Sequence, residues 1–277
     1  GKTLMLHTDG GVATSSNTWN DTTPTASVFS LGSNARVNTD GEDYIGYLFA
    51  GGASIAATAR SVEFDGGGDQ LATASDSNIE LGTGDFTIEG WFKIYGVEYQ
   101  FLFDQRLPSA PYAEGHLATL KMDTDGTLKY YSDSANRITS NVITTNQWFH
   151  AAVVRSSGVI KLYINGMQEG VSYSDSNNYA GESITIGQSQ RETTNAIYGS
   201  ISNFRLTKQA LYTSSFRPPT APFTTTSQGA TSSNVKLLCC NNASVTGSTV
   251  TTGALSASSP GPDAKTESPF DDPEGFQ

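Results

Sequence analysis

Residues 148–170 read WFHAAVVRSSGVIKLYINGMQEG, a pattern that predicts a β-hairpin preceded by another strand. Trp148 to Val154 is a nearly continuous apolar run, and a second run extends from Val159 to Ile164. The dipeptide Asn165-Gly166 then leads into residues 167–170. Asn-Gly tolerates the positive φ angles of a type I′ turn, which makes it a strong hairpin signal. This segment therefore predicts antiparallel β-structure.

The same kind of pattern extends over residues 57–223. Phe86, Ile88, Phe92 and Ile94 share one parity, which is typical of a half-buried strand. Asp-Gly at 125–126 indicates a second hairpin turn. Further short strands are predicted at 61–65, 117–122, 127–131, 183–186 and 200–206. Many short strands without a convincing helix between them predict an all-β fold, an antiparallel jelly-roll β-sandwich.

The alternation also predicts the core of this sandwich. Apolar residues at every second position of a half-buried strand face the interior. The residues expected to face inward are Phe64, Phe86, Ile88, Phe92, Val153, Leu162, Ile164, Ile186 and Phe204.

The two flanks differ in texture from the sandwich. Residues 1–55 are rich in Thr, Ser, Asn and Gly, with apolar runs at 27–31 and 44–50 that predict two strands. Two strands alone do not form a stable core, so we expect a partial β segment that completes an upstream or neighbouring module. Residues 224–277 are expected to be a Ser/Thr/Pro-rich linker with one strand, at 235–240, and an extended tail.

Composition excludes several classes of partner. The 16 Lys and Arg residues stand against 27 Asp and Glu residues, giving a net charge of −11, so we expect no nucleic acid as a partner. No run of about 18 apolar residues occurs, so we also expect no membrane span. The N-terminal residues lack a signal-peptide pattern, which suggests a fragment or a processed product. Cys239 and Cys240 are adjacent, which disfavours a disulfide and suggests assembly in a reducing cytoplasm.

Five motifs resemble the laminin-G-like, concanavalin A-like lectin and glucanase jelly rolls, in that family's order over about 160 residues. They are Val62-Glu63-Phe64-Asp65-Gly66, Leu81 to Trp91, Trp148 to Arg155 with Leu162 to Gly166, Ile184 to Gly187, and Gly199 to Leu206. The flanking segments 44–50 and 235–240 resemble linking segments of tail-fibre and appendage proteins of tailed, often marine, bacteriophages.

The resemblance implies a non-enzymatic virion protein, a tail fibre or appendage assembled in the host cytoplasm. Its lectin-like domain would bind host-surface glycans or neighbouring virion and fibre proteins. The alternative is a carbohydrate-binding module of a secreted bacterial adhesin or glycan-active enzyme. For either interpretation the incomplete flanks suggest a homo-oligomer, most plausibly a trimer.

The resemblance also implies a structural Ca²⁺. In related jelly rolls, carboxylates near the first strand hold this ion, and Asp65 and Asp69 match those positions. Asn203 stands where the late motif commonly has an Asp, which removes one negative charge from the implied ligand set. Solvated turn carboxylates are the simpler interpretation, and both stay open. No other cofactor is expected.

Catalysis is the weakest of the functional hypotheses. The Glu-x-Asp-x-x-Glu pattern of the β-glucanases is absent. Glu63 and Asp65 are two residues apart and could reach the separation of an inverting glycosidase, but they border a Gly-rich turn. His150, within an apolar strand, is expected to be a hydrogen-bonded structural residue.

Glycan contact would need aromatic faces beside polar groups. Five tyrosines in predicted loops are the candidates, although packing or a place at the rim is the more usual role of each one. They are Tyr95, Tyr99, Tyr112, Tyr173 and Tyr179.

Overall fold

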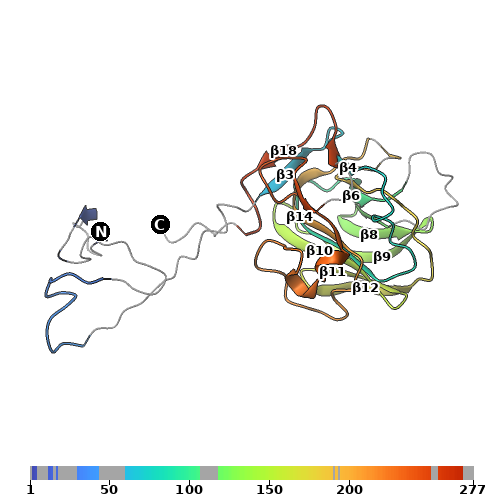
Figure 1. Cartoon of the computed structure of the whole chain (residues 1–277). Helices are drawn as coiled ribbons and strands as arrows, with labels where there is room; N and C mark the ends of the chain where they lie inside the picture. Colours follow the sequence, from blue (N-terminus) through green and yellow to red (C-terminus); the bar gives the residue numbers. More distant parts are fainter. Residues whose placement is uncertain are drawn as a thin grey trace. The chain divides into compact units, whose positions relative to one another are not determined.

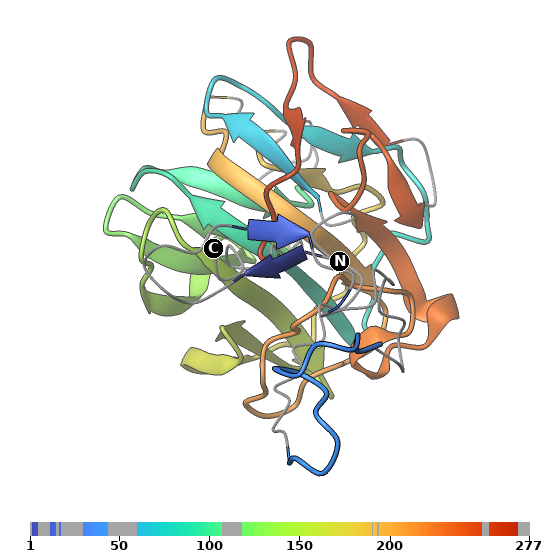
Figure 2. The ribbon, with the colours of Figure 1, turned by 90° about the vertical axis from the view of Figure 1, so that its left-hand side faces the viewer.

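The computed structural model describes residues 2–4, 12–14, 17, 30–43, 60–106, 118–189, 191–192, 194–250 and 255–270. The chain forms two compact units, residues 1–51 and residues 52–277. In the first unit, β1 (Lys2–Leu4) pairs antiparallel with β2 (Val12–Thr14) (Figure 2). The strand predicted at 44–50 lies outside the described residues. Of the strand predicted at 27–31, only Ser30 and Leu31 are described, and neither is in a strand.

The second unit is a sandwich of two antiparallel sheets (Figure 1). The first sheet has the order β12-β11-β10-β5-β14-β15-β16, with β3 beside β14 and β18 beside β3. Its strands are β3 (Ser61–Asp65), β5 (Phe86–Ile94), β10 (Trp148–Ser156), β11 (Val159–Ile164), β12 (Met167–Ser174), β14 (Tyr198–Thr207), β15 (Val235–Cys239), β16 (Ser248–Val250) and β18 (Asp263–Lys265).

The second sheet has the order β17-β4-β13-β6-β7-β8-β9. Its strands are β4 (Leu71–Thr73), β6 (Gln100–Asp104), β7 (Thr119–Met122), β8 (Thr127–Ser132), β9 (Ala135–Val142), β13 (Thr185–Ile186) and β17 (Leu255–Ala257). The only helical elements of two or more residues in the described chain are the 3₁₀ turns Ser227–Gly229 and Ser232–Asn234. The predicted jelly-roll class is thereby confirmed.

The core between the sheets is the one that the alternation predicts. All nine residues expected to face inward are buried and belong to one apolar cluster. The hairpin of β11 and β12 turns at Asn165 and Gly166, whose φ angles are +48° and +78°. Both angles are positive, as a type I′ turn requires.

The C-terminal segment completes both sheets instead of trailing from them. Where the sequence predicts one strand, the structure has four, because β16, β17 and β18 follow β15. β17 pairs with β4 in the second sheet, and β18 pairs with β3 in the first. These three-residue strands carry little apolar pattern of their own, and the partners of β17 and β18 lie far away in sequence. The sequence pattern therefore could not indicate them.

A buried polar network lies among the strands of the first sheet. Glu89 of β5 accepts hydrogen bonds from Arg205 of β14 through Oε1, at 2.9 and 2.6 Å. Its Oε2 accepts from the Tyr212 hydroxyl at 2.8 Å and lies 3.1 Å from Nε2 of His150. His150 is fully buried, which confirms its expected structural role.

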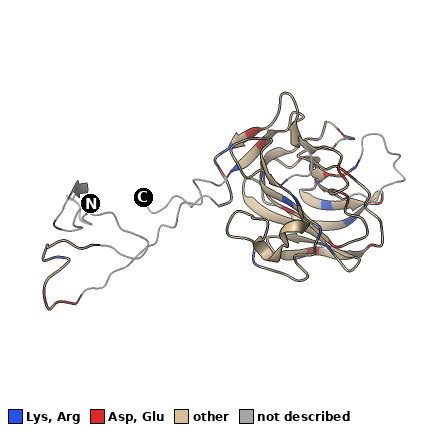
Figure 3. Cartoon of the chain, viewed as in Figure 1, with Lys and Arg blue, Asp and Glu red and all other residues tan. Residues whose placement is uncertain are grey.

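The charged residues of the sandwich are mixed in sign. Lysine and arginine positions and acidic positions are both scattered over the described strands and loops (Figure 3). In the part of the chain that the structure describes, no helix is long and apolar enough to cross a membrane.

We expect Gly166→Ala to lower the free energy of unfolding by about 2–4 kcal/mol. A Cβ at Gly166 would overlap the carbonyl oxygen of Phe216, whose N–H donates to the Gly166 carbonyl at 2.9 Å. Gly229 has nearly the same φ, +77°, but open space around its missing Cβ. Gly229→Ala should therefore cost only the strain of the φ angle, about 1 kcal/mol. Equal losses in urea unfolding would show that the overlap is relieved without cost.

Candidate functional site

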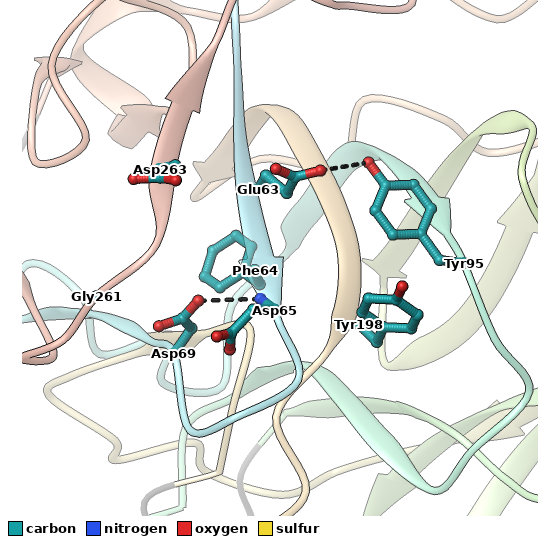
Figure 4. Close-up of a pocket in the computed structure, with 8 residues that line it drawn as sticks. All are labelled: Glu63, Phe64, Asp65, Asp69, Tyr95, Tyr198, Gly261 and Asp263. Carbon is teal, nitrogen blue, oxygen red and sulfur yellow. Dashed lines mark hydrogen bonds between the residues drawn. The ribbon is translucent and has the colours of Figure 1, made fainter.

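A cavity of about 280 Å³ opens where β3, β14 and β18 meet the turn after β3 (Figure 4). We call it the acidic cavity, because four of its eight lining residues are carboxylic. The lining residues are Glu63, Phe64, Asp65, Asp69, Tyr95, Tyr198, Gly261 and Asp263.

Strand alternation and a glycine turn bring three of the carboxylates together. Phe64 is fully buried in the core, so Glu63 and Asp65 lie on the opposite face of β3. Residues 66–68 are all glycine, and this turn returns the chain so that Asp69 Oδ2 accepts a hydrogen bond from the Asp65 N–H at 2.9 Å. Asp65 Oδ1 in turn accepts from the Gly67 N–H at 2.6 Å. The turn thus fixes both aspartates at the cavity.

Two tyrosines form the other wall. The Tyr95 N–H donates to the Tyr198 carbonyl at 2.9 Å, and their rings meet edge to face with centroids 5.3 Å apart. The Tyr95 hydroxyl donates to Glu63 Oε1 at 3.0 Å and also contacts the Ser200 hydroxyl at 2.9 Å. Tyr198 is 44% exposed. The cavity therefore combines an accessible aromatic ring with oxygen acceptors.

The lysine beside the cavity, Lys265, pairs with carboxylates on one side of it. Lys265 Nζ lies 2.7 Å from Glu63 Oε2 and 3.7 Å from Asp263 Oδ2. Neither Asp65 nor Asp69 takes part in any ion pair formed within the described residues. The cavity is consequently electronegative around these two aspartates.

The carboxylates respond to this distribution in opposite ways. The hydrogen bond from Lys265 lowers the pKa of Glu63; burial opposes this effect, and the hydrogen bond from Tyr95 adds to it. Burial raises the pKa of Asp69; the Asp65 N–H opposes this, while the charges of Asp65 and Asp263 reinforce it. The ionised form of Glu63 is therefore favoured, whereas burial and the neighbouring carboxylates disfavour the ionised form of Asp69.

The predicted glycan-contacting tyrosines lie in different places. Tyr95 lines the acidic cavity. Tyr99 accepts a hydrogen bond from Lys121 Nζ at 2.9 Å, and burial raises its pKa to about 12. Tyr173 lies under the Arg137 guanidinium, 4.8 Å from its ring centroid. Tyr112 lies outside the described residues.

Tyr179 is not a ligand-contacting residue, and this prediction is wrong. Its side chain is fully buried in the core, where its hydroxyl contacts those of Tyr130 at 2.9 Å and Ser132 at 3.1 Å. The surrounding Ser/Asn-rich sequence suggested an exposed loop. The bridge between Tyr179 and Gly82 instead draws the residue into the sandwich.

The three residues implied for calcium do not converge. Asp65 pairs with Tyr198 across the sheet, and Asn203 lies five residues further along β14, about 17 Å away at strand rise. The Asn203 amide is used locally, accepting from the Phe223 N–H and donating to the Ser202 hydroxyl, both at 2.9 Å. Among the described side chains no group of three or more metal-ligating residues occurs. Asp65 and Asp69 supply too few oxygens for the six to eight that Ca²⁺ takes, so these residues fit the ion poorly.

Two cavity residues escaped the sequence analysis altogether. Asp263 reaches the cavity through the pairing of β18 with β3, across about two hundred residues of sequence. Tyr198 immediately precedes the motif Gly199 to Leu206, and its position at the start of that strand was the available signal.

Solved structures show that the fold is a known one. The chain is 14% identical to a putative carbohydrate binding protein from Bacteroides ovatus, with a TM-score of 0.54, covering 75% of this chain and 60% of that one. It is 16% identical to a heptameric SAP-like pentraxin from Limulus polyphemus, with a TM-score of 0.49, covering 77% of this chain and 97% of that one. At these identities the likeness concerns the fold alone.

Sequence comparison gives the family. No curated protein sequence matches the chain. Residues 65–215, more than half of the chain, match the family described as the Concanavalin A-like lectin/glucanases superfamily. This match confirms the resemblance carried by the five sequence motifs, and the chain belongs to the concanavalin A-like lectin/glucanase superfamily.

Proposed function

We propose that the chain is a non-catalytic glycan-binding module and that the acidic cavity is its binding site. The observation that carries the proposal is the convergence of an accessible tyrosine ring and several carboxylates on one cavity. Sugar rings present apolar C–H faces that pack on aromatic rings, and hydroxyl groups that donate to carboxylates. A few convergent polar groups beside an aromatic wall are the usual composition of a small-ligand site.

The roles of the carboxylates favour binding over hydrolysis. A glycosidase needs a protonated carboxyl as general acid and a second carboxylate at a defined separation. Glu63 is paired with Lys265 and hydrogen-bonded by Tyr95, which suits a fixed acceptor. Asp69 has a pKa that burial raises, but its Oδ2 is occupied by the Asp65 N–H, which suits a fixed acceptor at the cavity wall.

The resemblance of the flanking segments supports a place for this module on a phage particle, in a tail fibre or appendage. Such a protein would contact other virion proteins, and association into a homo-oligomer such as a trimer would multiply weak sites through avidity. The fold shared with the putative carbohydrate binding protein of Bacteroides ovatus equally supports a module of a secreted bacterial protein. Neighbouring sequence on the same polypeptide distinguishes them: fibre modules favour the virion, and a cell-wall anchor favours secretion.

We expect Tyr198→Ala to weaken glycan binding at least tenfold, which corresponds to about 1.4 kcal/mol. The ring is accessible, and its removal would delete the exposed half of the aromatic wall and leave only Tyr95. The measurement is a glycan array, followed by titration calorimetry with the oligosaccharide that binds best. Val171→Ala is the matched control, because Val171 is 82% exposed on β12 and does not line the cavity. An array without any bound glycan, or equal affinities of the two variants, would refute the proposed site.

A further inference from the structure

We propose that the acidic cavity binds a primary ammonium group, so that its glycan is an amino sugar whose amine is not acetylated. The inference rests on the proposed glycan binding and names the ligand class of that same site.

The central observation is that Asp69 is buried without a counter-ion within the described part of the chain. The residue is only 6% exposed, yet no Lys or Arg of the described chain pairs with it. Its Oδ2 accepts the Asp65 N–H, whereas no donor among the described residues reaches its Oδ1. Burying a carboxylate without a counter-ion is costly, and a cation in the cavity would remove this cost.

The other carboxylates strengthen the same field. Asp65 lies beside Asp69, and Asp263 faces the cavity from β18 (Figure 4). Their charges are among the causes, after burial, that raise the pKa of Asp69. The two lysine ammonium groups that the structure describes near this end of the sheet are already paired, Lys265 with Glu63 and Lys93 with Glu267. A ligand cation would therefore enter next to Asp65 and Asp69.

The tyrosines make the cavity suitable for an organic cation on a sugar ring. Tyr198 exposes part of its ring, and aromatic rings attract ammonium groups through the negative potential of their faces. The volume of about 280 Å³ is close to the lower end of small-ligand pockets and fits one sugar residue. An ammonium group bound to the aspartates would place the sugar ring against this wall.

The probes are a fully deacetylated glucosamine hexamer and the N-acetylglucosamine hexamer of the same length. In calorimetry at pH 6 with EDTA, where the free amines are protonated, we expect the deacetylated hexamer to bind at least tenfold more tightly. Raising NaCl from 50 to 500 mM should reduce this preference, because salt screens charges at an open cavity. Asp69→Asn should abolish the preference, since the amide keeps an oxygen for the Asp65 N–H but loses the charge.

The matched control is Glu182→Gln, which removes one negative charge from an exposed residue outside the cavity and keeps an acceptor for the Ser75 hydroxyl. Asp65→Asn serves as the second cavity variant if Asp69→Asn unfolds in a thermal melt.

Equal binding of both hexamers, unaffected by Asp69→Asn, overturns the ammonium inference but leaves glycan binding intact. If calcium displaces the deacetylated hexamer and its own binding depends on Asp69 in the same way, the cavity is a metal site. This result also overturns the ammonium inference. Failure of both hexamers and of every arrayed glycan overturns the proposed function as well.

Discussion

Replacing Glu89 by Gln is expected to lower the free energy of unfolding by about 3–5 kcal/mol. Glu89 is the only counter-ion of Arg205 among the ion pairs of the described residues, and both side chains are fully buried. The amide would leave the guanidinium charged in the interior without a counter-ion, although it keeps its hydrogen bonds to Thr224 and Ser227. It would also disturb the hydrogen bond that Oε2 accepts from Tyr212. Urea unfolding at pH 7 measures the loss.

The same substitution at Glu63 is the control. Glu63 is paired with Lys265, but the two side chains are 34% and 40% exposed. Water and salt screen such a pair, so Glu63→Gln should change the free energy of unfolding by less than about 1 kcal/mol. If both variants lose the same stability, the Glu89 network contributes no more than a surface ion pair.

Stability should also depend on pH through Glu89. Burial alone would raise the pKa of Glu89, but the hydrogen bond with His150 and the charge of Arg205 outweigh it and lower the pKa. A carboxyl with a lower pKa in the folded state stabilises the protein above its unfolded pKa, about 4.3. This contribution is lost as the pH falls through the folded pKa. The difference in stability between the wild type and Glu89→Gln should therefore shrink in urea unfolding below about pH 4.

The sequence predicts the sandwich well because strand alternation is a local signal. Phe86, Ile88 and Phe92 reveal their buried face without any knowledge of their partners, and Asn165-Gly166 defines its turn by itself. β9 (Ala135–Val142) escaped prediction because it is mostly exposed, so it lacks the apolar alternation of a core strand.

The candidate site is predicted less well because it depends on pairings that are distant in sequence. Asp65 and Asp69 could be grouped from their spacing, since a short glycine turn joins them. Asp263 could not, because only the register of β18 on β3 brings it to them. The parity of Tyr95 and Tyr198 relative to the sheet likewise required the structure. Composition alone could not distinguish a tyrosine at a cavity from one in the core.

The prediction that Tyr179 contacts a ligand is wrong because the sequence does not reveal the contacts that Arg155 makes with its segment. This arginine of β10 is 2% exposed, and its guanidinium lies 5.5 Å from the centroid of the Tyr179 ring. It donates to the carbonyl oxygens of Asp175 at 2.9 Å, Asn177 at 3.0 Å and Gly82 at 3.3 Å. A segment whose Ser and Asn content suggests a free loop is thereby held against the sandwich.

Arg155→Met is accordingly expected to lower the free energy of unfolding by about 3–5 kcal/mol. Methionine preserves much of the apolar stem but leaves the carbonyl oxygens of Asp175 and Asn177 without the Arg155 donor, while the Gly82 carbonyl keeps the Tyr179 N–H. The substitution also removes the counter-ion of the buried Asp175 carboxylate. This carboxylate lies 3.3 Å from Arg155 Nε, an ion pair without a directed hydrogen bond. Urea unfolding measures the loss, and hydrogen exchange should rise at residues 175–179 before global unfolding.

A double-mutant cycle with Asp175→Asn separates the ion pair from the carbonyl contacts. Asp175→Asn removes the carboxylate charge that Arg155→Met would leave without a counter-ion. The double variant should therefore lose less free energy of unfolding than the sum of the two single losses, by at least about 1 kcal/mol. Strict additivity would mean that Arg155 acts only through the carbonyl oxygens of residues 82, 175 and 177. Glycan binding by Arg155→Met should match that of the wild type wherever the variant is folded, because neither Arg155 nor Tyr179 lines the acidic cavity. A selective loss of glycan binding in the folded variant would show instead that residues 175–179 belong to the ligand site.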